Sequence, residues 1–379
     1  MFLQHSLLPA FYRLGCFLHP RINSKLVVFA DAHHTAIPFS MVRMKRDIEA
    51  LGYQVVCHLH DYSRGGMIKG LFYSLVFMLL YAKARYVFIC DNFLPAAACK
   101  KRKETQLIQL WHSCGLLKRM GYDTTEDIPP FYKGNVYGNY DLVTVSAPCC
   151  IPFLTSGMRQ QPGIVQAVGV SRTDMYFDNA WRQECQTEFD RTYPQAKGKR
   201  ILLWAPTFRG NAASPSLCGL GEIQTLGQKL GEEWFLLIKV HPHLDTIALL
   251  QKGEPISNCS LQTERLLPVT DLLITDYSSV LFDFLLLERP FVLFAPDLEE
   301  YEADRGFYID YRTLTPFLTT EEGTLYQTVL WAYAAWKNGT YLQNLRGLKN
   351  FHCSACDGKA TKRILKLIEM EGDMHGTFL

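Results

Sequence analysis

The chain has 379 residues, of which 48% are hydrophobic and 20% are charged. This is the balance of an ordinary globular protein, and the length suits about two domains, so a disordered or fibrous chain is excluded. The net charge is only +2, but residues 1–120 carry 16 Lys and Arg against 6 Asp and Glu. We therefore expect the first third of the chain to face an anionic partner, either nucleic acid or an acidic membrane surface.

The N-terminal region is apolar without the length of a membrane span. The longest uncharged apolar run, Gly70–Ala82, has 13 residues, whereas a spanning helix needs about 20. Residues 1–21 lack the charged start and the cleavage site of a secretory signal. They fit two descriptions equally well: an interfacial segment whose apolar side chains run from Leu3 to Tyr12, or a helix docked on the protein's own core.

Predicted strands and helices alternate in the first half of the chain. Apolar, β-rich runs predict strands at 25–30, 54–59, 85–90, 106–110 and 142–145, and helices are predicted at 41–51 and 68–83. This alternation is typical of a parallel sheet covered by helices on both faces.

A second series begins after a break between Asp174 and Arg200, which holds a helix-compatible stretch at 181–193. New strands are predicted at 201–204, 235–240, 272–275 and 291–294. We therefore expect an α/β protein with two Rossmann-like domains, at 1–180 and 195–345, whose parallel sheets face an interdomain cleft. The remainder, 346–379, is predicted to be a helical segment, for which packing back on the first domain is one option.

The sharpest motif is DLLITDYSSVLFDFLLLERP at 271–290. The strand is predicted to end at Thr275, and a turn leads into a short helix whose first N–H groups favour an anion. A diphosphate held by the hydroxyls of Thr275, Ser278 and Ser279 is one interpretation, with Asp283 one turn further on the same face. Simple capping of the helix by Ser278 is the other.

Further polar residues follow predicted strands. His241 and His243 come directly after one strand and could act as acids, bases or phosphate donors. Arg209, in APTFR, could clamp a phosphate or form a surface ion pair.

His112, in QLWHSCGLLKRMGYD, also follows a strand. It could be a general base or a half-buried structural histidine. Gly115 is predicted to open a helix that carries Lys118 and Arg119.

The sequence lacks the motifs of several kinds of binding site. There is no P-loop, no GxGxxG after a strand, no Asp-x-Asp pair in a suitable loop and no interleaved basic and aromatic pattern. We therefore expect neither a cofactor nor a metal, and no nucleic acid as a partner. The basic first third of the chain is instead expected to face lipid head groups. The twelve cysteines are scattered, which fits reduced thiols. Cys353 and Cys356 form a lone CxxC, a weak signal for zinc or redox chemistry.

Taken together, these stretches resemble the CDP-glycerol glycerophosphotransferase family of teichoic acid and capsule polymer synthesis. The resemblance runs in order from about Lys83 to Asp310, through ARYVFICDNFLP, QLWHSCGLLKRMGYD, GVSRTD, APTFRG, KVHPH, LLITDYSSVLFDF and DLEEYEADRGFYIDY. The pair TDYSSVLFD and RGFYIDY is the most specific part.

The resemblance implies a GT-B-type fold and transfer of glycerol phosphate, or ribitol phosphate, from a CDP-alditol. The acceptor would be a hydroxyl of a polyprenyl-diphosphate-linked glycan or of a growing polymer, and CMP would leave. It further implies a peripheral protein at the cytoplasmic face of the membrane, with CDP-glycerol or CDP-ribitol, a lipid-linked glycan and an anionic membrane surface as partners.

The resemblance also assigns roles to individual residues. His112 would be the catalytic base, and His241 would act with it, in contact with the donor diphosphate. The donor and phosphate side would comprise Arg209, His243, Thr275, Asp276, Ser278, Ser279, Asp283 and Arg305. Ser113 and Lys118 would lie on the acceptor side.

The chain departs from the family pattern at two places that concern the acceptor. Ser113-Cys114-Gly115 stands where Gly-Thr-Pro usually follows the histidine, and DAHHTAIPFS follows the first strand in place of a Gly-Asn-rich turn. The lack of a large helical extension favours a priming enzyme. Two alternatives remain open: a GT-B glycosyltransferase that uses a nucleotide sugar, and a non-catalytic assembly protein.

Overall fold

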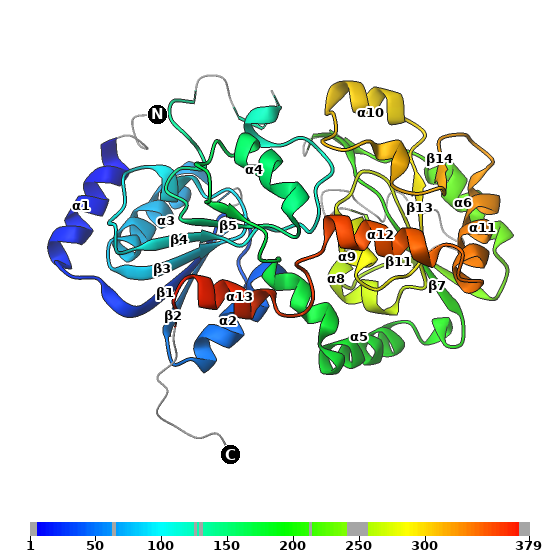
Figure 1. Ribbon diagram of the computed structural model, residues 1–379, viewed down its shortest axis with the longest axis horizontal. Helices are drawn as coiled ribbons and strands as arrows, with labels where there is room; N and C mark the ends of the chain where they lie inside the picture. The colour runs from blue at the N-terminus through cyan, green and yellow to red at the C-terminus, as the bar shows by residue number, and fades with distance from the viewer. Residues whose placement is uncertain are drawn as a thin grey trace, which may run out of the picture. The chain divides into compact units, whose positions relative to one another are not determined.

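The computed structural model describes residues 6–62, 66–124, 127–128, 132–211, 214–240 and 257–370. The chain divides into two compact units (Figure 1). Unit 1 comprises Met1–His112, Met120–Met175 and Ser354–Leu379, and unit 2 comprises Ser113–Arg119 and Tyr176–Cys353. The short segment after His112 therefore belongs to unit 2, which a division of the sequence into consecutive domains did not anticipate.

Unit 1 is built on a six-stranded sheet in the order β2-β1-β3-β4-β5-β6. All neighbouring strands are parallel. The strands are β1 (Asn23–Asp31), β2 (Gln54–Leu59), β3 (Ala84–Ile89), β4 (Gln106–Gln109), β5 (Leu142–Thr144) and β6 (Val165–Gln166). The five strands predicted here, and the parallel sheet, are confirmed; β6 was not predicted.

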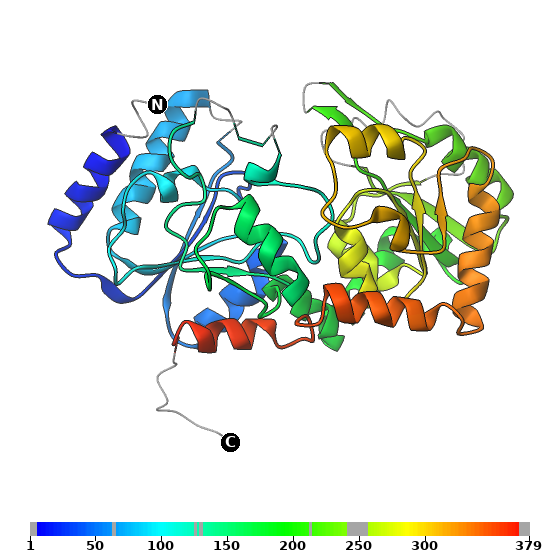
Figure 2. The ribbon, with the colours of Figure 1, turned by 45° about the horizontal axis from the view of Figure 1, so that its top comes forward.

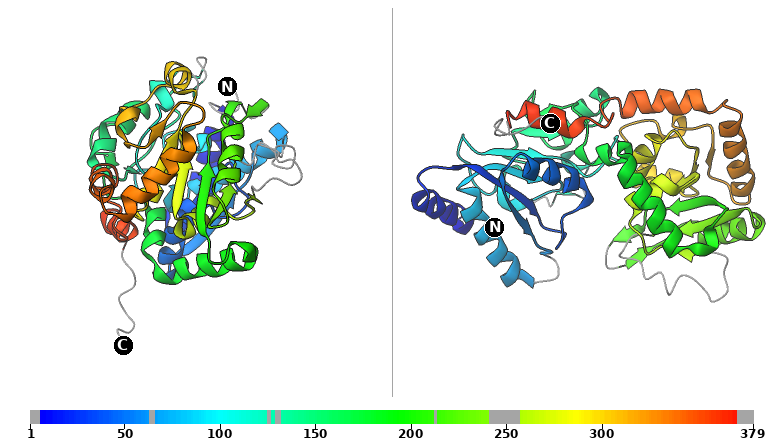
Figure 3. Two further views of the ribbon diagram at one scale, coloured as in Figure 1. Left: turned by 90° about the vertical axis from the view of Figure 1, so that its right-hand side faces the viewer. Right: turned by 90° about the horizontal axis from the view of Figure 1, so that it is seen from below.

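Helices cover both faces of this sheet: α1 (Leu8–Leu18), α2 (Phe39–Ala50), α3 (Gly66–Tyr81), α4 (Ile151–Gly157) and α13 (Ala360–Leu367). On one face, Phe29 and Phe88 of the strands pack with Met44 of α2 and Ile364 of α13. Helix α13, drawn in red, lies beside α2 in Figures 1 and 3. The end of the chain's described part thus completes the core of unit 1.

Helix α1 packs on α3, as Figure 2 shows. The Tyr12 ring lies 5.4 Å from that of Tyr81, and Gly15 is buried, with the Cβ of Ala82 close to it. Docking on the protein's own core is therefore confirmed for Leu8 and Tyr12, which the interfacial description had counted as its apolar face. The exposed apolar side chains of α1 are Leu14, Phe17 and Leu18 instead.

Unit 2 contains a second parallel sheet, in the order β11-β10-β7-β12-β13-β14. Its strands are β7 (Arg200–Ala205), β10 (Trp234–Ile238), β11 (Ser257–Asn258), β12 (Leu272–Thr275), β13 (Phe291–Phe294) and β14 (Leu318–Thr319). Strands β8 (Arg209–Asn211) and β9 (Ser214–Ser216) form a separate antiparallel pair. The four strands predicted in this half are confirmed, and β11 and β14 were not predicted.

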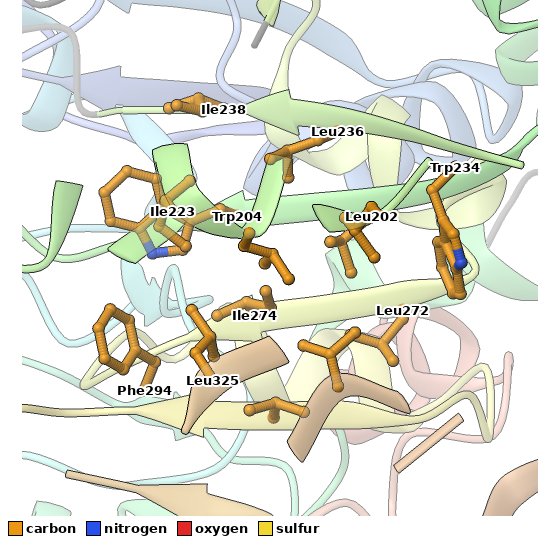
Figure 4. Close-up of a cluster of buried hydrophobic side chains, with 14 of the residues drawn as sticks. Leu202, Trp204, Ile223, Trp234, Leu236, Ile238, Leu272, Ile274, Phe294 and Leu325 are labelled. Carbon is orange, nitrogen blue, oxygen red and sulfur yellow. The ribbon is translucent and has the colours of Figure 1, made fainter. Parts of the chain in front are cut away.

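The helices of unit 2 are α5 (Asn179–Thr192), α6 (Leu220–Lys229), α8 (Thr263–Leu266), α9 (Val280–Leu285), α10 (Leu298–Asp304), α11 (Leu325–Lys337) and α12 (Leu342–His352). Figure 4 shows one face of the sheet, where Trp204 and Ile274 pack against Ile223 of α6 and Leu325 of α11. The predicted helix at 181–193 is α5, and the Asp178 carboxylate caps it.

The helix predicted after Gly115 is wrong. Residues 117–119 instead pair with residues 306–308 in the antiparallel sense: Arg119 N donates to Gly306 O at 3.2 Å and Tyr308 N to Leu117 O at 2.9 Å. Gly115 has φ +64°, and a Cβ there would lie 2.2 Å from the ring of Phe282. The glycine thus serves a left-handed turn packed tightly on an aromatic ring, and not the start of a helix.

Candidate active site

A strained turn at the end of β4 presents His112. Trp111 has φ +59°, a conformation that is costly for an aromatic residue and often marks a functional site. The buried side chain of Gln109 holds the turn, because it accepts from Trp111 N at 3.0 Å and donates to Asp91 O at 3.0 Å. His112 follows directly, and its side chain is 44% exposed.

The contacts of His112 define which ring nitrogen is available. Nδ1 lies 3.2 Å from the carbonyl oxygen of Cys90 and 3.8 Å from a carboxylate oxygen of Asp91. A carbonyl can only accept, so Nδ1 carries a proton and donates it. In the neutral ring Nε2 therefore bears the lone pair, which is the arrangement that a general base requires.

Two residues of the GVSRTD segment form hydrogen bonds, one to this turn and the other to the start of α13. The guanidinium of Arg172 donates to the backbone carbonyl of His112. Asp174 is buried and accepts from Ala360 N at 2.9 Å and Thr361 N at 2.8 Å, at the start of α13. One motif residue thus positions His112, and the other caps the last described helix of the chain.

In unit 2 a second cluster is centred on Arg209, where the APTFR, TDYSS and DLEEY segments meet. All three guanidinium nitrogens have protein acceptors. Nε and Nη2 bind the Asp297 carboxylate, with Nη2 at 2.9 Å from Oδ1, and Nη1 binds Thr207 O at 2.6 Å and Asp276 Oδ2 at 3.0 Å. The side chain is 16% exposed. Arg209 therefore belongs to a half-buried network of ion pairs and hydrogen bonds, and not to an ion pair on the surface.

The charges of this cluster stabilise one another. Burial would lower the pKa of Arg209, but hydrogen bonds and charges from Asp297 and Asp276 raise it above its usual range. Burial opposes ionisation of Asp297, yet the hydrogen bond from Arg209 lowers the pKa of this carboxyl. Burial raises the pKa of Asp276, against the opposing effect of Arg209. Such a network fixes geometry more than it adds stability.

Aromatic side chains enclose the cluster. Arg209 lies over the ring of Tyr277 at 4.8 Å and over that of Tyr301 at 5.2 Å. The Tyr277 hydroxyl donates to Asp297 at 2.9 Å. Phe307 and Tyr311, from RGFYIDY, pack on the Tyr277 ring, and the Tyr311 hydroxyl donates to Asp276 O at 3.2 Å. The two most specific segments of the sequence therefore meet around one ring.

The TDYSS turn separates into an interior part and an accessible part. The Thr275 hydroxyl is buried and donates to Ala205 O at 2.7 Å. Asp283 is also buried, and Tyr176 donates to it at 3.4 Å. Ser278 and Ser279 are half-buried, and Ser278 Oγ accepts from Val280 N at 3.4 Å. Of the predicted phosphate ligands in this motif, the two serines are thus the ones near the surface.

The remaining predicted site residues are placed less centrally. Arg305 Nε donates to Arg119 O at 3.2 Å, and Lys118 forms the bridge to Phe307. Ser113 is half-buried at the start of the same segment. His241 and His243 lie outside the described residues. In the described part of the chain, no group of three or more His, Cys, Asp or Glu side chains could hold a metal ion.

The fold is that of an α/β protein with two parallel-sheet units. The chain matches the family described as CDP-glycerol:poly(glycerophosphate) glycerophosphotransferase over residues 11–370, and it belongs to this family of enzymes. It is 32% identical over 268 residues to the teichoic acid ribitol-phosphate primase of Bacillus spizizenii, covering 67% of each chain. It is also 33% identical to the teichoic acid glycerol-phosphate primase of Bacillus subtilis, covering 61% of each chain.

Other relatives are longer. The chain is 32% identical to the teichoic acid poly(ribitol-phosphate) polymerase of Bacillus spizizenii, but it spans about half of that protein, 47%, with 76% of its own length. Among solved structures, the wall teichoic acid polymerase TagF superimposes with a TM-score of 0.77 at 19% identity, covering 97% of this chain and 93% of the other. A UDP-GlcNAc 2-epimerase from Neisseria meningitidis shares the fold more distantly, with a TM-score of 0.53.

Proposed function

We propose that this enzyme transfers glycerol phosphate or ribitol phosphate from a CDP-alditol to a hydroxyl of a polyprenyl-diphosphate-linked glycan or growing polymer, with release of CMP. The observation that carries the proposal is the orientation of His112, whose Nδ1 proton is committed to Cys90 O and whose Nε2 is left to take a proton. Two named relatives are a ribitol-phosphate primase and a glycerol-phosphate primase, which supports an alditol phosphate as the transferred group.

The proposed reaction is a phosphoryl transfer. His112 Nε2 takes the proton of the acceptor hydroxyl, the oxygen bonds to the alditol-bearing phosphorus, and the bond from that phosphorus to the CMP oxygen breaks. The rate then depends mainly on positioning and charge stabilisation. We expect a GT-B-type organisation, with the acceptor bound by unit 1 and the donor by unit 2.

In unit 2 the residues take different parts in this proposal. Ser278 and Ser279 offer hydroxyls to the donor diphosphate, Arg305 supplies positive charge, and His241 and His243 are assigned as hydrogen-bond donors to the same group. Arg209 is committed to Asp276 and Asp297, so we assign it the positioning of the TDYSS turn. Thr275 and Asp283 have protein partners in the interior, and we propose structural roles for both. Ser113 and Lys118 belong to unit 2, but their segment directly follows His112 in the sequence, so both stay candidates for the acceptor side.

We also propose that unit 1 binds the cytoplasmic face of a membrane as a peripheral protein. Helix α1 exposes Phe17 (81%) and Leu18, and α3 exposes Met67 and Ile68 (82%). Basic residues lie at the C-terminal ends of the two helices, near Phe17 and Leu18: Arg102 donates to Ala82 O and Cys16 O, and Lys100 and Lys103 beside it are exposed. At the other end of α3, Lys69 is exposed beside Met67 and Ile68. Apolar side chains fringed by cations suit an anionic lipid surface. None of the described helices has the length and apolarity to cross a bilayer.

The variant His112→Gln tests the proposed base. Glutamine can still donate to Cys90 O, but it cannot take a proton at neutral pH. We expect CMP release from a CDP-alditol to fall by about 10²–10⁴-fold, the usual contribution of general base catalysis, with little change in the binding of the donor. Unchanged turnover in this variant would exclude His112 as the base.

A further inference from the structure

A second histidine is held in a defined orientation at the end of β1. Asp31, the last residue of that strand, is 2% exposed although it is a carboxylate. Its Oδ1 accepts from the backbone N of His33 and of His34, both at 2.7 Å, and lies 2.9 Å from the ring Nδ1 of His34. The His34 side chain is 52% exposed. The buried carboxylate therefore orients an accessible imidazole.

This histidine resembles His112 in orientation and is linked to it through one residue. Asp31 Oδ2 lies 3.8 Å from the thiol of Cys90, and the carbonyl of the same Cys90 accepts from His112 Nδ1. In both rings Nδ1 faces the protein, so Nε2 is the nitrogen available to a ligand.

Sheet topology sets the separation of the two strand ends that these histidines follow. His34 follows β1 and His112 follows β4, and only β3 lies between these strands. All three are parallel, so their carboxyl ends share one edge of the sheet. Two strand spacings correspond to about 10 Å. A polyol or sugar with hydroxyls on successive carbons can span such a distance over one or two units.

We propose that His34, positioned by Asp31, binds a second hydroxyl of the acceptor while His112 acts on the reactive one. The inference rests on the proposed function and deepens it, because it names a specificity-determining residue on the acceptor side. His34 stands in the DAHHT segment, which directly follows β1. An imidazole there can form a hydrogen bond to a hydroxyl, so it favours an acceptor rich in hydroxyls.

The test measures acceptor binding by isothermal titration calorimetry on the full chain without donor. The probes are a short-prenyl-diphosphate-linked disaccharide and the same compound ending in glycerol phosphate. The variants are His34→Ala, His34→Gln, which keeps a polar group, and His33→Ala as the matched control. His33 gives Asp31 its backbone N–H, which alanine retains. Release of CMP from CDP-glycerol and CDP-ribitol is measured separately on every variant.

We expect His34→Ala to weaken binding of at least one probe about fivefold or more and to raise its KM, with the KM of the donor unchanged. His34→Gln should recover part of the loss, and His33→Ala should stay within twofold of the wild type. Equal binding by His34→Ala and wild type overturns the inference, as does a wild type that binds neither probe. Because CMP release is read separately, turnover that survives either result leaves the proposed function standing.

Discussion

Replacing Gly115 by alanine should destabilise unit 2 through a clash that the structure locates. The residue has φ +64°, and a new Cβ would lie 2.2 Å from Cγ and 2.4 Å from Cδ2 of the Phe282 ring. The backbone conformation alone costs about 1–2 kcal/mol for a residue with a Cβ. Overpacking against a buried ring adds about 1–3 kcal/mol. We therefore expect a total loss of about 2–5 kcal/mol.

Gly231 provides the matched control. It belongs to the same unit and has φ +67°, and a Cβ there would meet nothing within 4 Å among the described residues. Gly231→Ala should therefore show the backbone cost without the clash. For a body of 150–250 residues, each kcal/mol shifts Tm by about 2–4 °C. Differential scanning calorimetry should place the unit 2 transition of Gly115→Ala about 2–12 °C below that of Gly231→Ala.

A double variant tests the cause directly. Phe282→Leu replaces the ring by a smaller side chain. The double variant with Gly115→Ala should therefore lose less free energy of unfolding than the sum of the two single losses. Strict additivity, or equal Tm values for Gly115→Ala and Gly231→Ala, would refute the close packing of the Gly115 turn on this ring.

Three further outcomes follow from the structure. Arg209→Lys removes the two-pronged contact with Asp297 and should lower stability by about 1–3 kcal/mol, measured by urea unfolding; a change below about 0.5 kcal/mol would contradict the network. Burial lowers the pKa of His352, and burial together with a neighbouring histidine lowers that of His58, in each case to about 4, against about 6.5 in the unfolded chain. The unfolded chain then binds more protons between pH 6.5 and 4, so the stability present above pH 6.5 should fall by up to about 3 kcal/mol per ring as the pH drops. His352→Leu should flatten this dependence of stability on pH. An unchanged pH dependence in the variant would speak against the assignment. Phe17→Ser combined with Ile68→Ser should reduce co-sedimentation with anionic vesicles several-fold, and undiminished co-sedimentation would exclude the α1 and α3 surface.

The local sequence pattern was sufficient to predict the longer strands and the end of β4. Continuous apolar runs such as ILLW and FVLF can only be buried strands or helix segments, and their short length decides between the two. His112 could be placed at a strand end because a polar residue follows such a run. Strands of two residues, such as Leu318–Thr319, carry no period to detect.

Pairings between distant parts of the chain could not be predicted. For Arg209 the sequence offers a phosphate clamp or a surface ion pair, and nothing near it in the sequence indicates that Asp297, 88 residues later, binds its guanidinium. Similarly, Asp174 caps a helix that begins 186 residues further on. The helix predicted after Gly115 failed for the same reason, because residues 306–308 supply the hydrogen bonds of that segment.

One sequence feature that bears on the site was not used in the prediction: the polar residue Gln109 at the end of a strand. Gln109 is fully buried at the end of β4, and a buried amide needs partners for its donors and acceptors. It finds them in the backbone of Trp111 and Asp91, and so shapes the turn that carries His112. A glutamine directly before a histidine-bearing turn could have been read as its support.

The most direct test of the proposed function is CMP release by the wild-type protein with its donor varied. CDP-glycerol, CDP-ribitol and a panel of nucleotide sugars are each supplied with a prenyl-diphosphate-linked disaccharide, and the nucleotide product is quantified by chromatography. We predict CMP from at least one CDP-alditol, dependent on the acceptor and lost in His112→Gln. Turnover of a nucleotide sugar with neither CDP-alditol consumed would contradict the proposed transfer of an alditol phosphate.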